Sequence, residues 1–282
     1  MINIEYSNEG GIKVTVQNLQ DFNPNFPYRL NIRKHVSGEI QWSTDLLNNS
    51  WAAYPSTEMF DAEILDREGN PVFTRRWDLV LDGSIFYKSL WAYCKGILSS
   101  GRFPKGIVIG THDGEFGEWV PVVLKNLSKV VLVEASDKQF DKLDKNYRNN
   151  PNVVLVKNLI TPDGGEVEFF EGGEGYTNTV VEKVIRHWET EEIHSSSRES
   201  ISIDDLINTN YPEGFDWLHL DVEGLDAKLI RGISKEKNLP KFIIFEDYNL
   251  SPSEKEDIFG YLKNRGYNLH PEGGICQAIK IR

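Results

Sequence analysis

The chain has 282 residues, and its 31 lysines and arginines against 43 aspartates and glutamates give a formal net charge of −12. An acidic balance of this size disfavours binding along a nucleic-acid backbone or to an anionic membrane surface. No apolar run approaches the ~20 residues that span a bilayer, and the first residues lack a secretory pattern. Cys94 and Cys276 show no metal-binding spacing. We therefore expect a soluble, cytoplasmic globular protein without membrane insertion.

Residues 1–82 have the pattern of β structure. Residues 11–19 and 27–35 alternate apolar and polar side chains with a period of two, which predicts half-buried strands. Residues 60–78 predict a hairpin with its turn at Glu68-Gly69-Asn70. Short strands at this spacing favour a small all-β, sandwich-like domain that binds an acceptor or a partner. Four aromatic residues in it could stack on sugars or fill its core: Trp42, Trp51, Tyr54 and Trp77.

From residue 83 to residue 282 helices and strands alternate, which predicts a doubly wound, mainly parallel, Rossmann-like α/β domain. The first helix is expected at residues 83–100, and Ser202 is expected to cap a later one. Residues 164–199 predict a mobile lid with a short strand at 167–170 and a helical piece near Val184. The other expected strands, two of them with their turns, are residues 106–109, 130–133, 153–156, 215–224, 241–249, 267–270 and 277–281, and the other expected helices are residues 117–127, 138–149, 225–233 and 252–262.

A glycine-rich turn between the first of these strands and the next helix predicts a cofactor site. The apolar strand at residues 107–109 ends at Gly110, and Gly114 and Gly117 follow. Glycines at such a turn let a ligand approach the backbone. Glu134 ends the next strand, where a carboxylate can accept hydrogen bonds from a ribose diol. The turn is therefore expected to hold an adenosine-type cofactor.

Polar residues gather at the expected carboxyl ends of the strands, where open α/β sheets bind ligands. His219 precedes Asp221 by one alternation step, so both side chains are expected on one face of the sheet. His219 is then either a hydrogen-bonded core residue or a general base, and His112 either binds the cofactor or shapes the turn. The whole set at these strand ends is Gly110, His112, Asp113, Glu134, Asn158, Asp221, Glu223, Glu246 and Asp247.

Between residues 107 and 247 the chain resembles the FkbM family of methyltransferases. Residues 108–116, VIGTHDGEF, resemble the family's DxGANxGxF motif, and VLVEAS matches its second motif at Glu134. Further on, ISIDDL, HLDVEGLD and PKFIIFE follow in the family's order. The resemblance implies a class I methyltransferase type of fold and S-adenosyl-L-methionine as cofactor. It also implies these cofactor-binding residues: Gly110, Thr111, His112, Gly114, Phe116, Glu134, Ala135 and Asn158.

Four positions depart from the family's pattern. Val108 stands where the family usually has an acid, and His112 where it often has Asn. His219 replaces the usual Lys, and Asp226 replaces the usual Glu. The cofactor pocket is still expected despite these departures. The contacts near the methionine end of the cofactor are expected to differ from those of the family.

The resemblance also implies O-methyl transfer to a hydroxyl of a sugar, glycan or glycoconjugate. The base is expected to be Asp221 or His219, with Glu246 holding the acceptor or a cation. Three carboxylates, Asp221, Glu223 and Glu246, would suit Mg²⁺ or Mn²⁺.

Two other functions fit parts of the pattern. One is a non-catalytic glycan-binding or scaffold protein with a vestigial methyltransferase fold, and the other is a nicotinamide-dependent dehydrogenase. The wide GTHDGEFG spacing and the DVEG strand disfavour the dehydrogenase. The expected partner is a sugar or glycan acceptor and not a nucleic acid, and the sequence is compatible with a homo-oligomer.

Overall fold

The computed structural model describes residues 2–6, 12–16, 28–34, 40–46, 52–53, 60–66, 68–77, 85–115, 117–172, 178–188 and 193–280. Spatial contacts divide the chain into two compact units. The first comprises Met1–Trp91 with Glu115–Pro121, and the second Ala92–Gly114 with Val122–Arg282.

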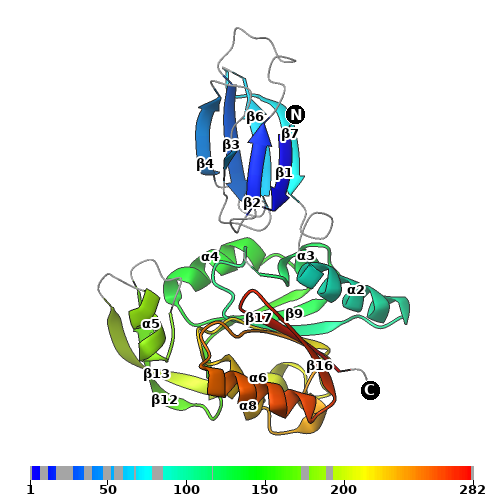
Figure 1. Ribbon diagram of the computed structural model, residues 1–282, viewed down its shortest axis with the longest axis vertical. Coiled ribbons are helices and arrows are strands. Elements are labelled where there is room, and N and C mark those ends of the chain that lie inside the picture. Colours follow the sequence, from blue (N-terminus) through cyan, green and yellow to red (C-terminus); the bar gives the residue numbers. More distant parts are fainter. Residues whose placement is uncertain are drawn as a thin grey trace. The chain divides into compact units, whose positions relative to one another are not determined.

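The described residues of the first unit form two antiparallel sheets (Figure 1). The described strands at residues 12–16 and 28–34 lie within the strands expected at 11–19 and 27–35, and the described residues of the expected hairpin at 60–78 pair as a hairpin. Gly69 forms the hairpin turn with a φ of 86°. One sheet has the order β1 (Ile2–Tyr6), β2 (Ile12–Val16), β5 (Ala52–Ala53), and the other β4 (Ile40–Leu46), β3 (Tyr28–Lys34), β6 (Phe60–Leu65), β7 (Pro71–Trp77).

The role of this β-rich part and its boundary stay predictions. Asp82, Trp51 and Tyr54 lie outside the described residues, as do the side chains of Trp42 and Trp77.

The second unit is built on a seven-stranded sheet, which confirms the expected mainly parallel architecture. Neighbouring strands are parallel, except that β17 runs antiparallel to both of its neighbours. The order is β10 (Val153–Lys157), β9 (Lys129–Glu134), β8 (Lys105–Ile109), β14 (Trp217–Leu220), β15 (Phe242–Glu246), β17 (Ile275–Lys280), β16 (Tyr267–Glu272). After β8 the chain proceeds outward to β10 and later resumes at β14 on the other side of β8. This reversal places a topological switch point between β8 and β14, where ligands bind in such sheets.

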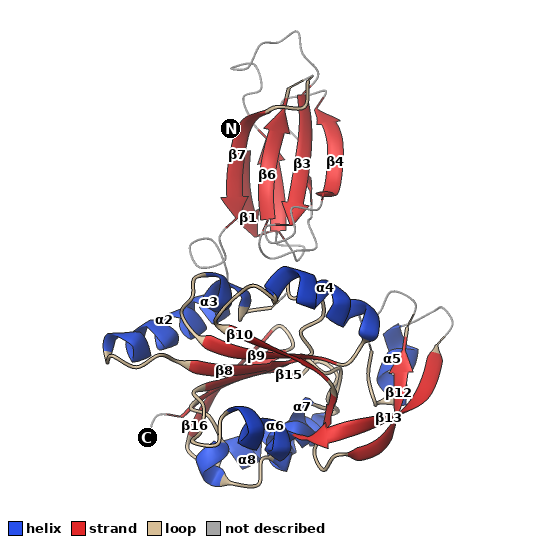
Figure 2. Ribbon diagram, turned by 180° about the vertical axis from the view of Figure 1, so that it is seen from behind, coloured by secondary structure: helices blue, strands red, loops and turns tan. Residues whose placement is uncertain are grey.

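The middle strands of this sheet are covered on both faces, so their sequences are continuously apolar. All four residues of β14 and the first four of β15 are buried. Helix α4 (Asp137–Tyr147) lies on one face, and α6 (Ile203–Asn210), α7 (Asp226–Gly232) and α8 (Pro252–Lys263) lie on the other (Figure 2). The cap predicted for α6 is confirmed, since the Ser202 hydroxyl accepts from the Asp205 N–H.

The helix that follows the glycine turn is shorter than expected. Helix α2 (Ile85–Ser99) matches its prediction, but α3 spans Val120–Leu124 instead of residues 117–127. Gly117 and Asn126 have φ values of 98° and 54°. A right-handed helix cannot contain such residues, so they bound α3.

Described parts of the segment expected as a mobile lid, residues 164–199, pair with β11 in a separate small sheet. Strands β11 (Leu159–Thr161), β13 (His194–Ser202) and β12 (Gly165–Glu171) pair in this order, and α5 (Glu182–Trp188) packs beside β12 (Figure 1). The strand at 167–170 and the helix near Val184 are confirmed. The mobile excursion expected over the remainder of residues 164–199 is wrong at residues 194–199, because antiparallel pairing with β12 draws this polar segment into β13.

Among the described residues, no helix combines the length and the hydropathy that crossing a membrane requires.

Candidate cofactor-binding site

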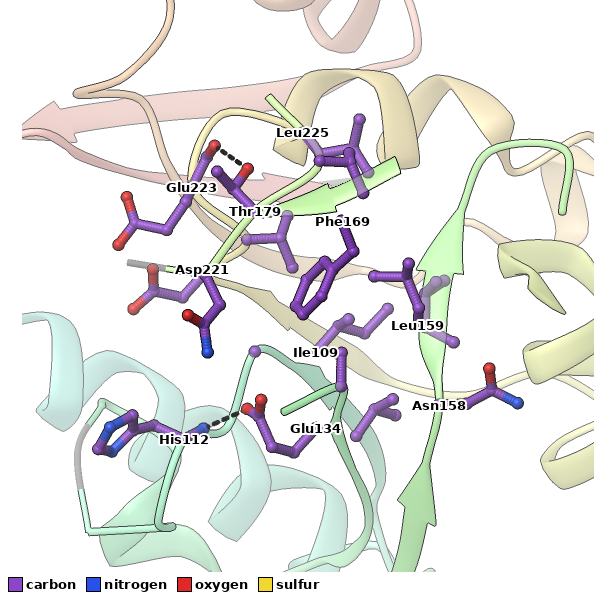
Figure 3. A pocket seen from close by; sticks show the side chains of 17 residues that line it. Ile109, His112, Glu134, Asn158, Leu159, Phe169, Thr179, Asp221, Glu223 and Leu225 are labelled. Atoms are coloured by element: carbon purple, nitrogen blue, oxygen red, sulfur yellow. Dashed lines mark hydrogen bonds between the residues drawn. The ribbon is translucent and has the colours of Figure 1, made fainter. Parts of the chain in front are cut away.

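A pocket opens at the switch point, at the carboxyl ends of β8, β9 and β14 (Figure 3). The small sheet of β11, β13 and β12, called the inserted sheet below, supplies its remaining wall. The residues that matter below are Ile109, Gly110, His112, Glu134, Ala135, Asn158, Leu159, Phe169, Thr179, Asp221 and Glu223.

The glycine turn requires glycine at residue 110. Gly110 has a φ of 81°, and a Cβ there would lie 1.8 Å from the Asp221 carbonyl oxygen. The backbone N–H groups of Gly110 and Thr111 both donate to the Val133 carbonyl. The turn between β8 and α3 is thus held against both neighbouring strands, and its backbone forms the floor of the pocket.

Glu134 is fixed at the tip of β9. Its Oε2 accepts from the His112 N–H and its Oε1 from the Ser136 N–H, each at 2.8 Å. Burial raises the pKa of this carboxyl, and the two N–H groups partly oppose that effect. A carboxylate oxygen can accept a second hydrogen bond. Glu134 therefore presents two oriented acceptor atoms toward the pocket, the arrangement that a vicinal diol requires.

Not every residue predicted to bind the cofactor reaches the pocket. Thr111 is buried with its hydroxyl donating to the Val133 carbonyl. Gly114, with a φ of 84°, lies against Tyr147 of α4, whose hydroxyl donates to the Gly114 carbonyl at 2.6 Å. These two residues shape the turn. Phe116 lies outside the described residues. The predicted residues that do line the pocket are Gly110, His112, Glu134, Ala135 and Asn158.

An acidic wall closes the end of the pocket beside β14. Asp221 and Glu223 line it, and Asn249 Nδ2 donates to Glu223 Oε2 at 2.8 Å and to Glu246 Oε2 at 2.9 Å. Burial, followed by the charges of Asp221 and Glu246, raises the pKa of Glu223 to about 9. Burial and Asp221 raise the pKa of Glu246 to about 7. At neutral pH Glu223 is therefore mainly a neutral carboxyl that can donate a hydrogen bond.

The described residues do not form the predicted Mg²⁺ or Mn²⁺ site at Asp221, Glu223 and Glu246. No group of three or more His, Cys, Asp or Glu in the described part of the chain is arranged to hold a metal ion. Asn249 links two of these carboxylates and occupies an acceptor oxygen on each. Glu246 does not line the pocket in its described part.

His219 does not stand at the pocket. It lies inside β14 with 6% of its surface exposed, and its Nδ1 has no hydrogen-bond partner among the described residues. Burial lowers its pKa to about 3. Of its two predicted roles, the structure favours the buried core residue over the general base.

The neutral His219 predicts a measurable pH dependence of stability. The pKa of His219 in the folded protein, about 3, lies below the ordinary histidine value of 6.5, so between these two pH values the unfolded chain binds more protons. The contribution of His219 to the free energy of unfolding is complete above pH 6.5. As pH falls below 6.5, this contribution is lost by up to about 1.4 kcal/mol per pH unit. Denaturant titrations at several pH values should show a shallower slope for His219→Gln than for the unchanged protein. Equal slopes would contradict a buried neutral imidazole.

Three residues of the site were not predicted from the sequence. Phe169 comes from β12, and the Thr179 hydroxyl donates to the Glu223 carbonyl at 2.9 Å. This contact holds Glu223 at a φ of 52°, which is uncommon for a residue other than glycine. Asn249 follows β15 by three positions. The available signal was the Phe169-Phe170 pair, which directs one ring to each face of a strand.

A comparison with protein families gave a match. A sequence profile described as the methyltransferase FkbM domain matches residues 109–269, more than half of the chain. The comparison with curated proteins gave no match.

Solved methyltransferases share distant similarity. A METTL16 methyltransferase domain has 13% identity and a TM-score of 0.40, over 69% of this chain and 65% of that domain, just under two thirds of its length. Fibrillarin of Aeropyrum pernix, with natively bound S-adenosyl-L-methionine, has 10% identity and a TM-score of 0.40, over 99% of each chain. Precorrin-6y C5,15-methyltransferase of Geobacter metallireducens has 11% identity and a TM-score of 0.35, over 66% and 85%. Such likenesses carry no information on the substrate.

Proposed function

We propose, from the premise that this chain belongs to the FkbM family of methyltransferases, that it transfers a methyl group from S-adenosyl-L-methionine to a sugar hydroxyl. The family and the sheet order make the fold class I methyltransferase-like. One observation carries the cofactor assignment: Glu134, at the tip of β9, is held by two backbone N–H groups beside the glycine turn.

The residues present fit the cofactor. Glu134 would accept from the two ribose hydroxyls, and the backbone from Gly110 to His112 would lie along the methionine part. Asn158, after β10, would face the base. The cofactor supplies a methyl group that its positive sulfur makes electrophilic. This chain must then orient the acceptor oxygen and remove its proton.

Asp221 is our choice for the proton acceptor. It lines the pocket immediately after β14 and is exposed, so an acceptor molecule can reach it. Glu223 is mainly protonated at neutral pH and would donate a hydrogen bond to the acceptor instead. Glu246 would act only through Asn249, as a positioning residue.

An acceptor screen tests this proposal. The protein is incubated with S-adenosyl-L-methionine and a panel of glycosides and oligosaccharides, and S-adenosylhomocysteine and O-methyl products are measured by mass spectrometry. We expect one class of sugar to gain a methyl group on oxygen. Asp221→Asn should reduce kcat by about 100-fold or more without a matching change in affinity for S-adenosylhomocysteine.

Two outcomes would contradict the proposal. Methylation only of nitrogen, or only of compounds without a sugar hydroxyl, would refute the acceptor class. Absence of both methyl transfer and S-adenosylhomocysteine binding would favour the non-catalytic glycan-binding or scaffold function.

A further inference from the structure

We infer that Phe169, supported by Arg198, is the face on which the cofactor's adenine ring stacks, so that the inserted sheet is part of the cofactor site. The inference rests on the proposed cofactor. It assigns a role to a segment that was expected to act only as a lid over the substrate.

The position of Glu134 limits where the adenine can lie. With the ribose diol on Glu134, the methionine part extends along the glycine turn toward Asp221 at one end of the pocket. The base is attached at the other side of the ribose. That side is lined by Ala135, Asn158, Leu159 and Phe169.

Phe169 is suited to an aromatic base. Among the described residues that line the pocket, it is the only phenylalanine, tyrosine or tryptophan. Its ring projects from β12 into the pocket, with Ile109 and Leu159 nearby (Figure 3). Only 2% of its surface is exposed. A base stacked there would be shielded from water, which favours stacking between flat apolar rings.

Arg198 fixes this ring. Its guanidinium carbon lies 4.8 Å from the centroid of the Phe169 ring, so one face of the ring is covered by the cation. Its Nη1 donates to the Ala135 carbonyl at 2.9 Å, and its Nη2 pairs with Glu171 at 2.8 Å. Arg198 thereby links the inserted sheet to Ala135, the residue directly after Glu134 at the end of β9. Ribose and base contacts are then held by one connected group of residues.

The same strand offers a matched control. Phe170 follows Phe169 in β12 and is also buried, with 7% of its surface exposed. It lines a different pocket, beside Thr161 and Lys228. Leucine at either position removes a buried ring from β12, but only the change at residue 169 alters the wall of the cofactor pocket.

Two probes separate stacking from a structural role. S-adenosylhomocysteine contains adenine, whereas S-ribosylhomocysteine is the same molecule without the base. Calorimetric titration of the full chain should show that Phe169→Leu weakens S-adenosylhomocysteine binding by about 10- to 100-fold. Its affinity for S-ribosylhomocysteine should remain unchanged, and Phe170→Leu should affect neither ligand. Arg198→Lys, which keeps the charge but loses the paired contacts, should give a smaller loss for S-adenosylhomocysteine alone.

Three results would overturn the inference. Equal weakening of both ligands by Phe169→Leu would mean that the ring only supports the fold of the wall. An unchanged affinity for S-adenosylhomocysteine would place the adenine elsewhere. Failure of the unchanged protein to bind S-adenosylhomocysteine would refute the cofactor assignment itself, and the inference with it.

Discussion

Replacing Gly110 by alanine is expected to lower the free energy of unfolding by about 3–5 kcal/mol and to abolish cofactor binding. Two effects add. A φ of 81° is unfavourable for a residue with a Cβ, and that Cβ would lie 1.8 Å from the Asp221 carbonyl oxygen. The oxygen belongs to backbone directly after β14, so relief requires β8 and β14 to separate at the mouth of the pocket. Chemical denaturation gives the stability, and calorimetry with S-adenosylhomocysteine gives the binding.

Gly101→Ala provides the matched control for this prediction. Gly101 has nearly the same φ, 80°, but a Cβ there would meet nothing within 4 Å. The Gly101→Ala variant should lose only about 1–2 kcal/mol of its free energy of unfolding, which is the backbone part of the effect. It should bind S-adenosylhomocysteine as the unchanged protein does. Similar losses at the two positions would show that the contact with Asp221 has no energetic importance.

Removing the Glu134 side chain is expected to have the largest effect on affinity. Glu134→Ala deletes both acceptor oxygens and leaves the N–H groups of His112 and Ser136 without their partner. Hydrogen bonds to a charged acceptor contribute about 1.5–3 kcal/mol each, so the loss of two should weaken S-adenosylhomocysteine binding at least about 100-fold. Calorimetric titration of the variant measures the change.

Asp137→Ala controls for the loss of one negative charge near the same strand. The Asp137 side chain is 71% exposed and pairs with Lys157 at 2.9 Å, and it does not line the pocket in its described part. We expect its affinity for S-adenosylhomocysteine to stay close to that of the unchanged protein. A fully folded Glu134→Ala that still binds tightly would mean that the ribose is held by another residue.

Much of the fold could be predicted because its central strands are unusually uniform. The apolar runs that end at Ile109, Glu134 and Glu246 are buried on both faces, so their length and flanking residues identified them. Strand β13 could not be predicted in this way. Its sequence, HSSSRESIS, is mostly polar, and only pairing with the distant β12 makes it a strand.

The residues of the candidate site could be predicted where they lie at the end of a strand. Gly110 and Asp221 directly follow buried strands and Glu134 ends one, so their place at the carboxyl edge was determined by the chain order. Phe169 and Thr179 line the pocket, and Asn249 bonds Glu223, through contacts between distant segments, which periodicity cannot reveal.

The described residues do not support the general-base role of His219 or the metal site, each for a physical reason of its own. Alternation indicates which way a side chain points from a strand, but it does not indicate whether a helix covers that face. Nearness of acids along the strand ends likewise does not show that their oxygens converge on one point, as a metal requires.

Calorimetric titration of the unchanged protein with S-adenosylhomocysteine tests the central claim, that the pocket at the switch point between β8 and β14 is a cofactor site. The account predicts saturable binding of one molecule per chain, lost in Glu134→Ala and retained in Asp137→Ala. Absence of binding by the correctly folded, unchanged protein would contradict it.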